Sequence, residues 1–400
     1  MKVLLINNIF YRKGGSEAVF FNTAEILKKH GHEVVFFSFK REENVACEQS
    51  EYFPELGGKA KQMISYFWNK EAARQLEKLI IAEKPDVAHV HLFWGLMSPS
   101  IFGVLQKHNV PLVHTAHDYR LVCPGYTFKD GKGEACERCK RWNYYQCALH
   151  KCSKGNIVLS TVMSTEMYTR QLFKNPLKNI DGFIFVSKFS EQKHIEHHNE
   201  YKDAHHIVLY NYTSPMLEPA MEKKEDYFLF YGRLSYEKGI PTLLKVFAKN
   251  PELKLKVVGD GPLGDGLRSE YASYKSIEFL GYKSGLDLFE LVRNAKFVCV
   301  PSEWYENNPM TIVESYSLGT PVIGANIGGI PEIIEEGKTG LLFESGNVSA
   351  LEEQVVKAAA TTGKDYEAMA NAAFAFYEQN FSEKHHYEEL MKFYNSVIKK

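Results

Sequence analysis

The chain has 400 residues, 44% of them hydrophobic and 24% charged, a composition typical of globular proteins long enough for two domains. Its 48 Lys and Arg residues balance 49 Asp and Glu residues, which argues against nucleic acid as a partner. No apolar run approaches the roughly eighteen residues of a membrane span, and the start, MKVLLIN, is typical of a first strand rather than a signal peptide. We therefore expect a cytoplasmic protein.

Short apolar runs alternate with helical patterns over residues 1–211. The runs predicted as strands are KVLLIN (2–7), EVVFFSF (33–39), DVAHVHL (86–92), PLVHTAH (111–117), GFIFVS (182–187) and IVLYN (207–211). Strands this apolar need helices on both faces, which predicts a doubly wound parallel sheet in an N-terminal Rossmann-like domain.

Two loops at the predicted carboxyl ends of these strands carry candidate site residues, because ligands of such sheets bind there. After the first strand, Gly14 and Gly15 would let the backbone approach a ligand, with Ser16 capping a helix that begins at Glu17. The alternative is a plain glycine turn. After the fourth strand comes HTAHDY, where the position of His117 favours a functional role over the structural one that is commoner for a single histidine.

Five of the seven cysteines fall in an insertion over residues 123–152. The four candidate ligands of a closed tetrahedral zinc site, spaced C-x2-C-x7-C-x4-C, are Cys136, Cys139, Cys147 and Cys152. His150 is a substitute ligand, and free thiols and disulfides are the alternatives. The segment has little apolar periodicity, so a structural zinc could order it.

The polar segment YTSPMLEPAMEKKED, with two prolines, predicts a linker over residues 212–226. The alternation then restarts with YFLFYG (227–232), LKLKVVG (253–259), SIEFLG (276–281), KFVCVPS (296–302) and TPVIGA (320–325). We expect a second doubly wound parallel sheet over residues 227–381, facing the first domain across a cleft.

The loop after the first of these strands, GRLSYEKGIP, places Arg233 and Lys238 before a predicted helix. A guanidinium fork and an ammonium point charge suit a diphosphate, and a solvated pair of charges is the alternative. VVGDGPLG holds a literal G-x-G-x-x-G beginning at Gly259. It opens the second unit of its domain and Pro262 stiffens it, so we predict a tight turn rather than a dinucleotide fingerprint.

Two glutamates flank a proline in PSEWYENNPMTIVESYSLG (301–319). Pro309 suits the first position of a helix with Asn308 as N-cap, and Gly319 suits the position after its end. Glu306 then precedes the helix, and Glu314 lies about one and a half turns inside it.

The free amides of that helix start predict an anion site near Asn307, Asn308 and Met310. Two carboxylates beside an anion site suit a ligand with hydroxyls and phosphate. The alternative is a pair of exposed glutamates near a cap.

The last segment, residues 382–400, predicts a helix capped by Ser382 with an apolar stripe. The stripe consists of Tyr387, Leu390, Met391, Tyr394 and Ile398. We expect it to cover a surface outside the second domain.

Taken together, the motifs resemble a retaining glycosyltransferase of family 4, of the subset with a cysteine-rich insertion. The motifs, in family order, are GGSE (14–17), HD (117–118), GRLSYEKG (232–239), GDGP (259–262), E-x7-E (306–314) and GGIPEII (328–334). Each is weak alone, and six in order are specific. The resemblance implies a GT-B fold of two facing Rossmann-like domains, transfer of a hexose from a UDP-, GDP- or ADP-sugar, and no catalytic metal. It also implies a final helix that crosses back to the N-terminal domain.

The resemblance also implies a role for each site residue. Arg233 and Lys238 match the motif that binds the donor diphosphate, Glu306 the glutamate that holds the sugar hydroxyls, and Glu314 the one that holds the ribose. His117 matches a histidine near the donor sugar and the transferred bond. The glycine loop would abut the diphosphate and the acceptor. Asn307 and Asn308 replace the more usual Gly-Phe, which leaves the donor sugar open.

Some similar sequences act in surface polysaccharide assembly, so the acceptor is expected to be a carbohydrate or a lipid-linked carbohydrate. MISYFWNK (63–70) and KRWNYY (140–145) mix aromatic and basic residues. Peripheral contact with the inner face of a membrane is one interpretation of these segments, and a core-facing helix with a zinc-loop surface is the other. The alternative functions are a nucleotide-sugar epimerase or hydrolase, and a non-catalytic partner subunit. Such a subunit would be expected to lose motif residues that this chain keeps.

Overall fold

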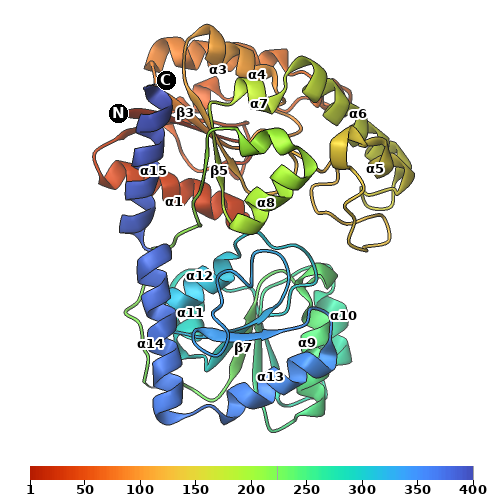
Figure 1. Cartoon of the computed structure of the whole chain (residues 1–400), viewed down its shortest axis with the longest axis vertical. Helices are drawn as coiled ribbons and strands as arrows, with labels where there is room; N and C mark the ends of the chain where they lie inside the picture. The colour runs from red at the N-terminus through yellow and green to blue at the C-terminus, as the bar shows by residue number, and fades with distance from the viewer. Residues whose placement is uncertain (223, 400) are drawn as a thin grey trace. The chain divides into compact units, whose positions relative to one another are not determined.

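The computed structural model describes residues 1–222 and 224–399. Position 223 of the predicted linker and position 400 of the predicted final helix lie outside the described residues. The chain divides into two compact units (Figure 1). Unit 1 holds Met1–Leu209 and the segment from Tyr387 onward, and unit 2 holds Tyr210–His386.

Unit 1 is built on a six-stranded sheet whose paired strands are all parallel. The strands are β1 (Lys2–Asn7), β2 (Glu33–Phe37), β3 (Val87–Leu92), β4 (Leu112–Ala116), β5 (Gly182–Phe185) and β6 (His206–Val208), in the order β2-β1-β3-β4-β5-β6. The predicted strands of this half are present, several of them shorter than predicted. The strand order reverses between β1 and β3. Because these two strands are adjacent and parallel, the loops that follow them are neighbours.

The helices of unit 1 cover this sheet and extend beyond it. They are α1 (Gly15–Lys29), α2 (Lys59–Ser65), α3 (Lys70–Glu83), α4 (Ser100–Lys107), α5 (Tyr145–Leu149), α6 (Ile157–Phe173), α7 (Pro176–Asn179) and α8 (Lys188–His197), with short 3-10 turns at Glu48–Tyr52, Lys140–Trp142 and Asn199–Lys202. The last helix, α15 (Glu383–Ile398), begins in unit 2 and packs in unit 1 from Tyr387 onward. None of the helices in the described part of the chain combines the length and hydropathy that crossing a bilayer requires.

Unit 2 repeats the architecture with a second all-parallel sheet of six strands. The strands are β7 (Phe228–Tyr231), β8 (Leu255–Val258), β9 (Ile277–Gly281), β10 (Phe297–Val300), β11 (Val322–Ala325) and β12 (Gly340–Phe343), in the order β12-β11-β10-β7-β8-β9. β12 was not predicted, because its four-residue run GLLF is short and lies outside the alternation that marks the other strands. Strand order reverses between β7 and β10, the position where ligands of doubly wound sheets bind.

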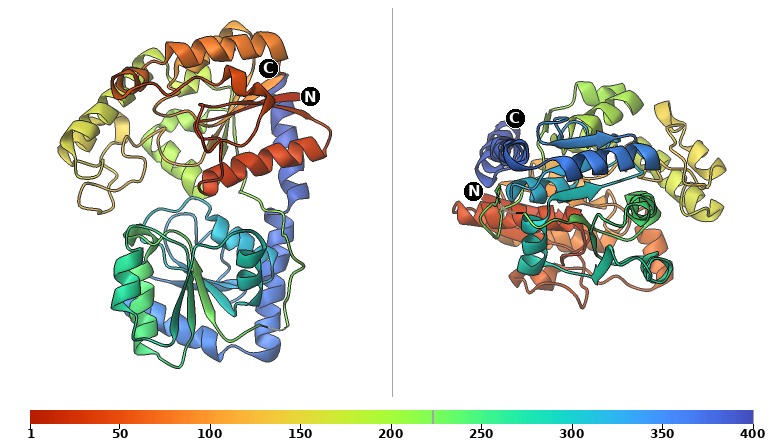
Figure 2. Two further views of the ribbon diagram at one scale, coloured as in Figure 1. Left: turned by 180° about the vertical axis from the view of Figure 1, so that it is seen from behind. Right: turned by 90° about the horizontal axis from the view of Figure 1, so that it is seen from below.

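Helices cover both faces of the second sheet (Figures 1 and 2). They are α9 (Ile240–Lys249), α10 (Gly264–Glu270), α11 (Gly285–Asn294), α12 (Met310–Ser317), α13 (Val348–Ala360) and α14 (Gly363–Asn380), with a 3-10 turn at Tyr236–Lys238. Phe228 and Phe230 belong to one apolar cluster, whereas Leu229 and Tyr231 belong to another. This alternation explains why the strand reads as continuously apolar.

The cysteine segment does not support the zinc prediction. Among the residues that the structure describes, no group of three or more His, Cys, Asp or Glu side chains is placed to hold a metal ion, and all seven cysteines are free thiols. Cys139 and Cys147 pack with Tyr144 and Met167 in a small apolar cluster between α5 and α6, and Cys152 at its edge is close enough to hydrogen-bond with Cys147 and Cys136. Spacing suggested ligands because it could not reveal that α6 supplies this segment with a core.

Candidate active site

Two loops at the reversal point of the second sheet bring the main predicted residues together. β7 and β10 are neighbours and run parallel, with Phe228 opposite Phe297. The loops that follow the two strands therefore leave the sheet at the same edge. Lys238 follows β7 and Glu306 follows β10. Glu306 Oε1 accepts a hydrogen bond of 2.6 Å from Lys238 Nζ. Each residue was predicted from its own loop, and the ion pair between them was not predicted.

Three donors converge on the same oxygen of Glu306. Besides Lys238, Trp304 Nε1 donates at 2.6 Å and Ser302 Oγ at 3.0 Å. The Lys238 ammonium also lies 5.3 Å from the centre of the Trp304 ring. Burial by itself raises the pKa of Glu306, but the charge of Lys238 and the hydrogen bonds from Lys238, Trp304 and Ser302 hold that pKa below its ordinary value. Glu306 is therefore a carboxylate at neutral pH.

The Arg233 loop is fixed by the turn that follows β8. Leu234 N–H donates to the Asp260 carbonyl at 2.9 Å, and Leu263 N–H donates to the Leu234 carbonyl at 3.1 Å. Gly259 has a φ of +129°, and a Cβ there would lie 1.9 Å from the Gly232 carbonyl oxygen. The glycine motif is therefore the tight turn that we predicted. It fixes the backbone of the loop that carries Arg233, whose side chain is exposed.

Two buried polar atoms in these loops have no hydrogen-bond partner among the described residues. They are the Ser235 hydroxyl, in the turn that leads to Lys238, and the Asn308 side-chain amide nitrogen. Ser235 is 2% exposed and Asn308 is 5% exposed. Buried polar groups are normally satisfied, so these two are candidates for contacts to a ligand.

Helix α12 begins one residue later than predicted, and Asn308 is not its N-cap. The helix starts at Met310, with Pro309 at the cap position and no side-chain cap. The Asn308 carboxamide oxygen instead accepts from the Asn211 backbone N–H at 2.7 Å, and Asn211 Nδ2 donates to the Asn308 carbonyl at 3.0 Å. The first amides of α12 thus lack a side-chain cap, as the predicted anion site would require. Gly319 has the predicted positive φ, 67°.

The loop before α12 rests on the GGIPEII segment. Gly329 N–H donates to the Glu306 carbonyl at 2.7 Å. A Cβ at position 329 would lie 1.9 Å from the Asn307 carbonyl oxygen, so the two backbones meet without room for a side chain. Asn307 is 9% exposed. The glycine pair thereby fixes the backbone that carries Glu306.

Glu314 lies on α12 beside the end of β7. Its Oε2 accepts from the Tyr231 hydroxyl at 3.1 Å, and the same hydroxyl reaches the Thr311 carbonyl at 2.9 Å. Burial raises the pKa of Glu314 to about 7, although the hydrogen bond from Tyr231 lowers it. The two glutamates of the motif therefore differ, because Glu306 is held as a carboxylate while Glu314 titrates near neutrality.

In unit 1, His117 follows β4 and pairs with a second histidine. His91 Nδ1 and His117 Nε2 are 2.8 Å apart, and the rings stack at 5.1 Å. Burial lowers the pKa of His117 to about 4, so the ring is neutral at pH 7. Asp118 forms an ion pair with Arg120 at 3.0 Å. The sequence analysis missed His91, which lies inside a strand, where a histidine reads as core.

The glycine loop of unit 1 differs from the prediction in its cap. Helix α1 begins at Gly15, with Gly14 in an extended conformation at the N-cap position and no side-chain cap. Ser16 is the second residue of the helix, and its hydroxyl donates to Glu17 Oε1 at 3.1 Å. Glycine leaves the amides of the helix start uncovered, and this suits the close backbone approach that was predicted.

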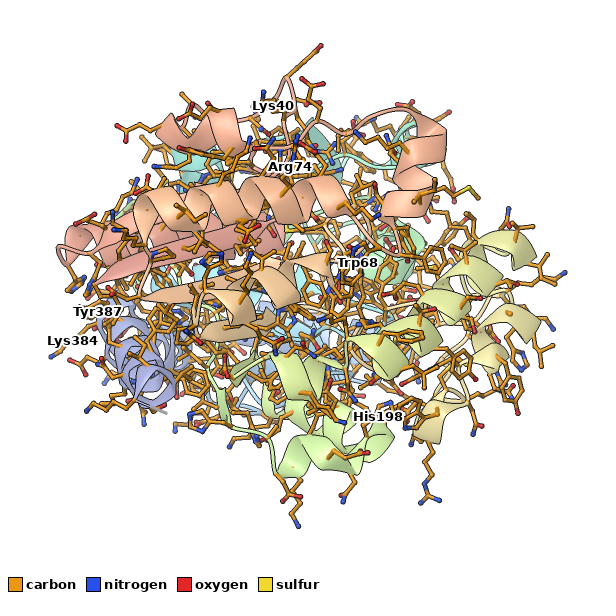
Figure 3. All side chains as sticks on the ribbon, turned by 90° about the horizontal axis from the view of Figure 1, so that it is seen from above. Lys40, Trp68, Arg74, His198, Lys384 and Tyr387 are labelled. Carbon is orange, nitrogen blue, oxygen red and sulfur yellow. The ribbon has the colours of Figure 1, made fainter. Side chains whose placement is uncertain are left out.

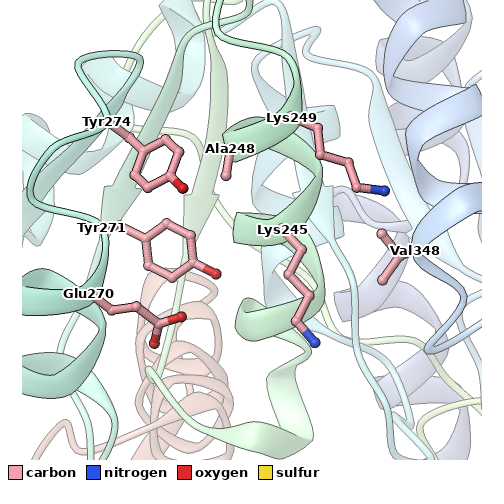
Figure 4. Close-up of a pocket in the computed structure, with 7 residues that line it drawn as sticks. All are labelled: Lys245, Ala248, Lys249, Glu270, Tyr271, Tyr274 and Val348. Atoms are coloured by element: carbon pink, nitrogen blue, oxygen red, sulfur yellow. The ribbon is translucent and has the colours of Figure 1, made fainter.

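A pocket of about 430 Å3 on unit 2 lies outside this site (Figure 4). It is lined by residues of α9, α10, the segment before β9 and the start of α13, including Lys245, Tyr271 and Tyr274. None of the predicted site residues lines it. We therefore base no function on it.

The fold and these loops place the chain among glycosyltransferases. The family described as Glycosyltransferase Family 4 matches residues 13–212, and the family described as Glycosyl transferases group 1 matches residues 218–376. The chain belongs to glycosyltransferase family 4 and has the GT-B fold.

Among sequence relatives, an uncharacterized 42.6 kDa protein in the cps region of Klebsiella pneumoniae is 24% identical over 83% of this chain and 87% of its own length. The sulfoquinovosyl transferase SQD2 of Arabidopsis thaliana is 27% identical over 71% of this chain, which spans 52% of that enzyme.

Among solved structures, sucrose-phosphate synthase from Thermosynechococcus elongatus matches with a TM-score of 0.72 at 18% identity, over 99% of this chain and 98% of that one. HepE from Anabaena, in complex with UDP-glucose, matches with a TM-score of 0.65 at 16% identity, over 99% of this chain and all of that one. At these identities the structural likeness establishes the fold alone.

Proposed function

We propose that the protein is a retaining glycosyltransferase that moves a hexose from a nucleotide diphosphate sugar to an acceptor hydroxyl. The observation that carries this proposal is the Lys238–Glu306 ion pair at the reversal point of the second sheet, next to the unpartnered buried hydroxyl of Ser235. A cation, a carboxylate and free amides at one edge of a sheet match the diphosphate, the sugar hydroxyls and the leaving charge of such a donor.

In the proposed reaction, the bond between the anomeric carbon and the diphosphate oxygen breaks, and the electron pair leaves with the diphosphate. Arg233, Lys238 and the first amides of α12 stabilise the negative charge that develops there. The acceptor oxygen bonds to the anomeric carbon on the face that the diphosphate leaves. The acceptor proton passes to the departing phosphate oxygen, so retention needs no covalent intermediate on the enzyme.

The other predicted residues take supporting roles in this proposal. Glu306 accepts hydrogen bonds from the sugar hydroxyls, with Asn307 and Asn308 beside it. Glu314 accepts from the ribose, and neutral His117 takes the donor-sugar role that the family resemblance gives it. Gly14, Gly15 and Gly259 leave the backbone accessible, and Pro309 and Met310 begin the helix whose amides face the phosphates. UDP, GDP and ADP sugars are the candidate donors, and the UDP-glucose complex of HepE favours testing UDP sugars first.

We also propose a place in surface polysaccharide assembly, in the cytoplasm at the inner face of the membrane, with a carbohydrate or lipid-linked carbohydrate as acceptor. The similarity to a protein of the cps region of Klebsiella pneumoniae supports this placement.

The test is a donor screen followed by product analysis. A panel of nucleotide sugars is first screened by thermal shift, and each stabilising donor is then incubated with oligosaccharide and lipid-linked acceptors. The proposal expects a new glycoside with the anomeric configuration of the donor, resolved by NMR. Free sugar or an epimerised donor without glycoside would support the hydrolase or epimerase alternative. Donor binding without turnover on any acceptor would support the non-catalytic subunit.

A further inference from the structure

One exposed face of helix α6 carries no charged residue. The exposed residues of this 17-residue helix are Ile157, Val158, Leu159, Thr161, Thr165, Leu172 and Phe173. Its only Asp, Glu, Lys or Arg residues, Glu166 and Arg170, form an ion pair at 3.2 Å, with side chains 12% and 2% exposed. Helices on a protein surface ordinarily place charge on the outer face and apolar residues on the inner one. The exposed fractions of Leu172 and Phe173, 70% and 75%, show the opposite arrangement.

Neighbouring segments extend this uncharged surface. Helix α5 packs on α6, where Ser164 Oγ donates to the Tyr144 carbonyl at 2.7 Å, and it exposes Tyr145 and Leu149. Helix α2 ends at Ser65, and the next residue, Tyr66, is near enough to Glu166 and Arg170 for their charges to act on it. The exposed apolar residues of α2 and the turn after it are Met63, Ile64 and Trp68, the last labelled in Figure 3. We call these exposed residues of α2, α5 and α6 the α2–α6 surface.

Cations outnumber acids in the segments that form the α2–α6 surface. Two of these cations are already paired, because Arg170 is buried against Glu166 and Lys140 meets Glu137 and Glu196, which lie outside those segments. Residues 58–70 and 139–179 contain ten of the 48 Lys and Arg residues of the chain but one of its 49 Asp and Glu residues, the half-buried Glu166. The remainder of the chain therefore carries a net negative charge. Arg141, Lys151 and Lys154 are exposed, and no ion pair is found for them within the described residues.

We propose that the α2–α6 surface docks on an anionic lipid bilayer. Exposed Val, Leu, Phe and Trp side chains would enter the boundary between headgroups and acyl chains, while the flanking Lys and Arg side chains contact lipid phosphates. A second copy of the chain is a poor occupant, because pairing two such surfaces would bring their cations together. A soluble polyanion is also a poor occupant, because it would bind the cations but leave the apolar side chains of Leu172 and Phe173 exposed to water. The inference deepens the membrane association proposed above and commits it to particular residues.

Helices α5 and α6 lie on the side of unit 1 away from α15 (Figures 1 and 2). Within that unit, docking would therefore leave the contacts of α15 undisturbed. It would also hold unit 1 at the membrane, where a lipid-linked acceptor resides.

The first experiment is flotation of the full-length protein with vesicles, in the absence of donor. Vesicles of 70% phosphatidylcholine and 30% phosphatidylglycerol are compared with pure phosphatidylcholine vesicles. The proposal expects binding to the anionic vesicles that weakens as salt is raised, because the cations are screened. It also expects a blue shift of tryptophan emission when Trp68 enters the interface.

Matched variants locate the contact. Val158→Glu with Leu172→Glu changes two exposed positions of α6, so the fold should persist while vesicle partitioning falls at least about tenfold. Leu286→Glu with Val356→Glu is the control on α11 and α13, at exposed fractions of 51% and 49%. Lys151→Glu with Lys154→Glu should reduce binding to anionic vesicles by more than about tenfold, with Lys364→Glu as its control.

Several outcomes would overturn the proposal. Absence of flotation with anionic vesicles would do so, and so would vesicle binding that is retained both by the α6 double variant and by the Lys151→Glu with Lys154→Glu variant. Self-association of the wild type that the α6 variants abolish, without vesicle binding, would assign the surface to a second copy instead. None of these results depends on donor turnover. The α6 variants should keep wild-type turnover on a water-soluble acceptor, so failure of the proposed chemistry would be recognised separately.

Discussion

At the scale of single residues, the site depends on how burial is balanced against charge. Glu306 is buried and Glu314 is half-buried, and only Glu306 receives a cation and two further donors. In the ion pair the Glu306 side chain is 10% exposed and that of Lys238 29%, so loss of Lys238 would leave the more desolvated charge without its cation. Such a pair is more easily explained by a ligand that uses both charges than by stability alone.

Lys238→Ala and Arg233→Ala should each reduce turnover strongly while the fold persists. Losing one charge-assisted contact to a diphosphate is expected to cost on the order of 2–4 kcal/mol, or about 30- to 1000-fold in kcat/KM. Steady-state kinetics with the donor identified by thermal shift would measure the loss. Lys275→Ala, at an exposed lysine away from the site, is the control. If both variants keep near-wild-type activity, the diphosphate assignment is wrong.

The raised pKa of Glu314 predicts a pH-dependent stability. A carboxyl group whose pKa is higher in the folded state contributes stability that is fully present below its ordinary pKa, near 4.5, and is lost as the pH rises to about 7. Stability relative to Glu314→Gln should therefore fall between about pH 4.5 and 7 and level off above. Urea denaturation of both proteins across this range would measure it. A difference that stays constant with pH would mean that Glu314 ionises normally.

At the scale of elements, the site is assembled from loops held both by backbone contacts and by side-chain hydrogen bonds. The sequence predicted which loops leave the sheets, because strand runs and glycines are local signals. It could not predict that Asn308 would bond Asn211 instead of capping α12, because the two residues are distant in sequence. The hydrogen bonds from Trp304 and Ser302 could not be predicted either, since they depend on how one loop folds back on Glu306.

Gly259→Ala should disrupt the Arg233 loop. The new Cβ would meet the Gly232 carbonyl oxygen at 1.9 Å in a conformation that side chains rarely adopt, so we expect a loss of more than about 1 kcal/mol in stability and a larger loss of donor affinity. Gly266→Ala, inside α10 with open space at its Cβ, should instead stabilise the protein by up to about 1 kcal/mol. Chemical denaturation and donor titration would measure both. Equal behaviour of the two variants would contradict the steric argument.

The small apolar cluster around Cys139 and Cys147 gives a test of whether packing or a metal stabilises the cysteine segment. Tyr144, Cys147 and Met167 are fully buried, so Met167→Ala should cost about 2–5 kcal/mol. Because packing stabilises the segment, treatment with a chelator should leave the melting temperature unchanged. Thermal melts of wild type with and without chelator, beside the variant, would decide. A large drop on chelation would restore the metal hypothesis that the spacing first suggested.

At the scale of the whole molecule, unit 1 is discontinuous in sequence because its last helix comes after unit 2. The predicted apolar stripe of α15 shares Leu390 and Tyr394 with the buried face of the helix but differs at other positions. The residues that bury themselves are Leu390, Phe393, Tyr394 and Val397, whereas Met391 and Ile398 are only partly covered. Helical periodicity identified the helix, and the surface it meets decided which stripe turns inward. Ser382 does not cap it, since its hydroxyl donates to the Glu378 carbonyl.

The contacts of α15 within unit 1 are close and specific. Tyr394 OH lies 2.6 Å from His89 Nδ1 on β3, and Tyr387, labelled in Figure 3, stacks on His30 at 3.7 Å. A Cβ at Gly182 would lie 2.8 Å from both Phe393 and Val397, so the glycine at the start of β5 lets the helix approach the sheet. The N-terminal half of the chain therefore cannot complete its core until the last residues are present.

Deleting residues 387–400 should consequently destabilise unit 1 and abolish turnover, because the deletion uncovers the apolar surface that α15 buries. Phe393→Ala in the intact chain should cost about 3–5 kcal/mol on its own, whereas Lys392→Ala, one residue away on the exposed side, should be nearly neutral. Differential scanning calorimetry of the three proteins would measure the losses, and binding of a dye to apolar surface would report the uncovered face. If the truncated chain melts at the wild-type temperature and keeps its activity, α15 is a dispensable tail and the N-terminal half completes its core without it.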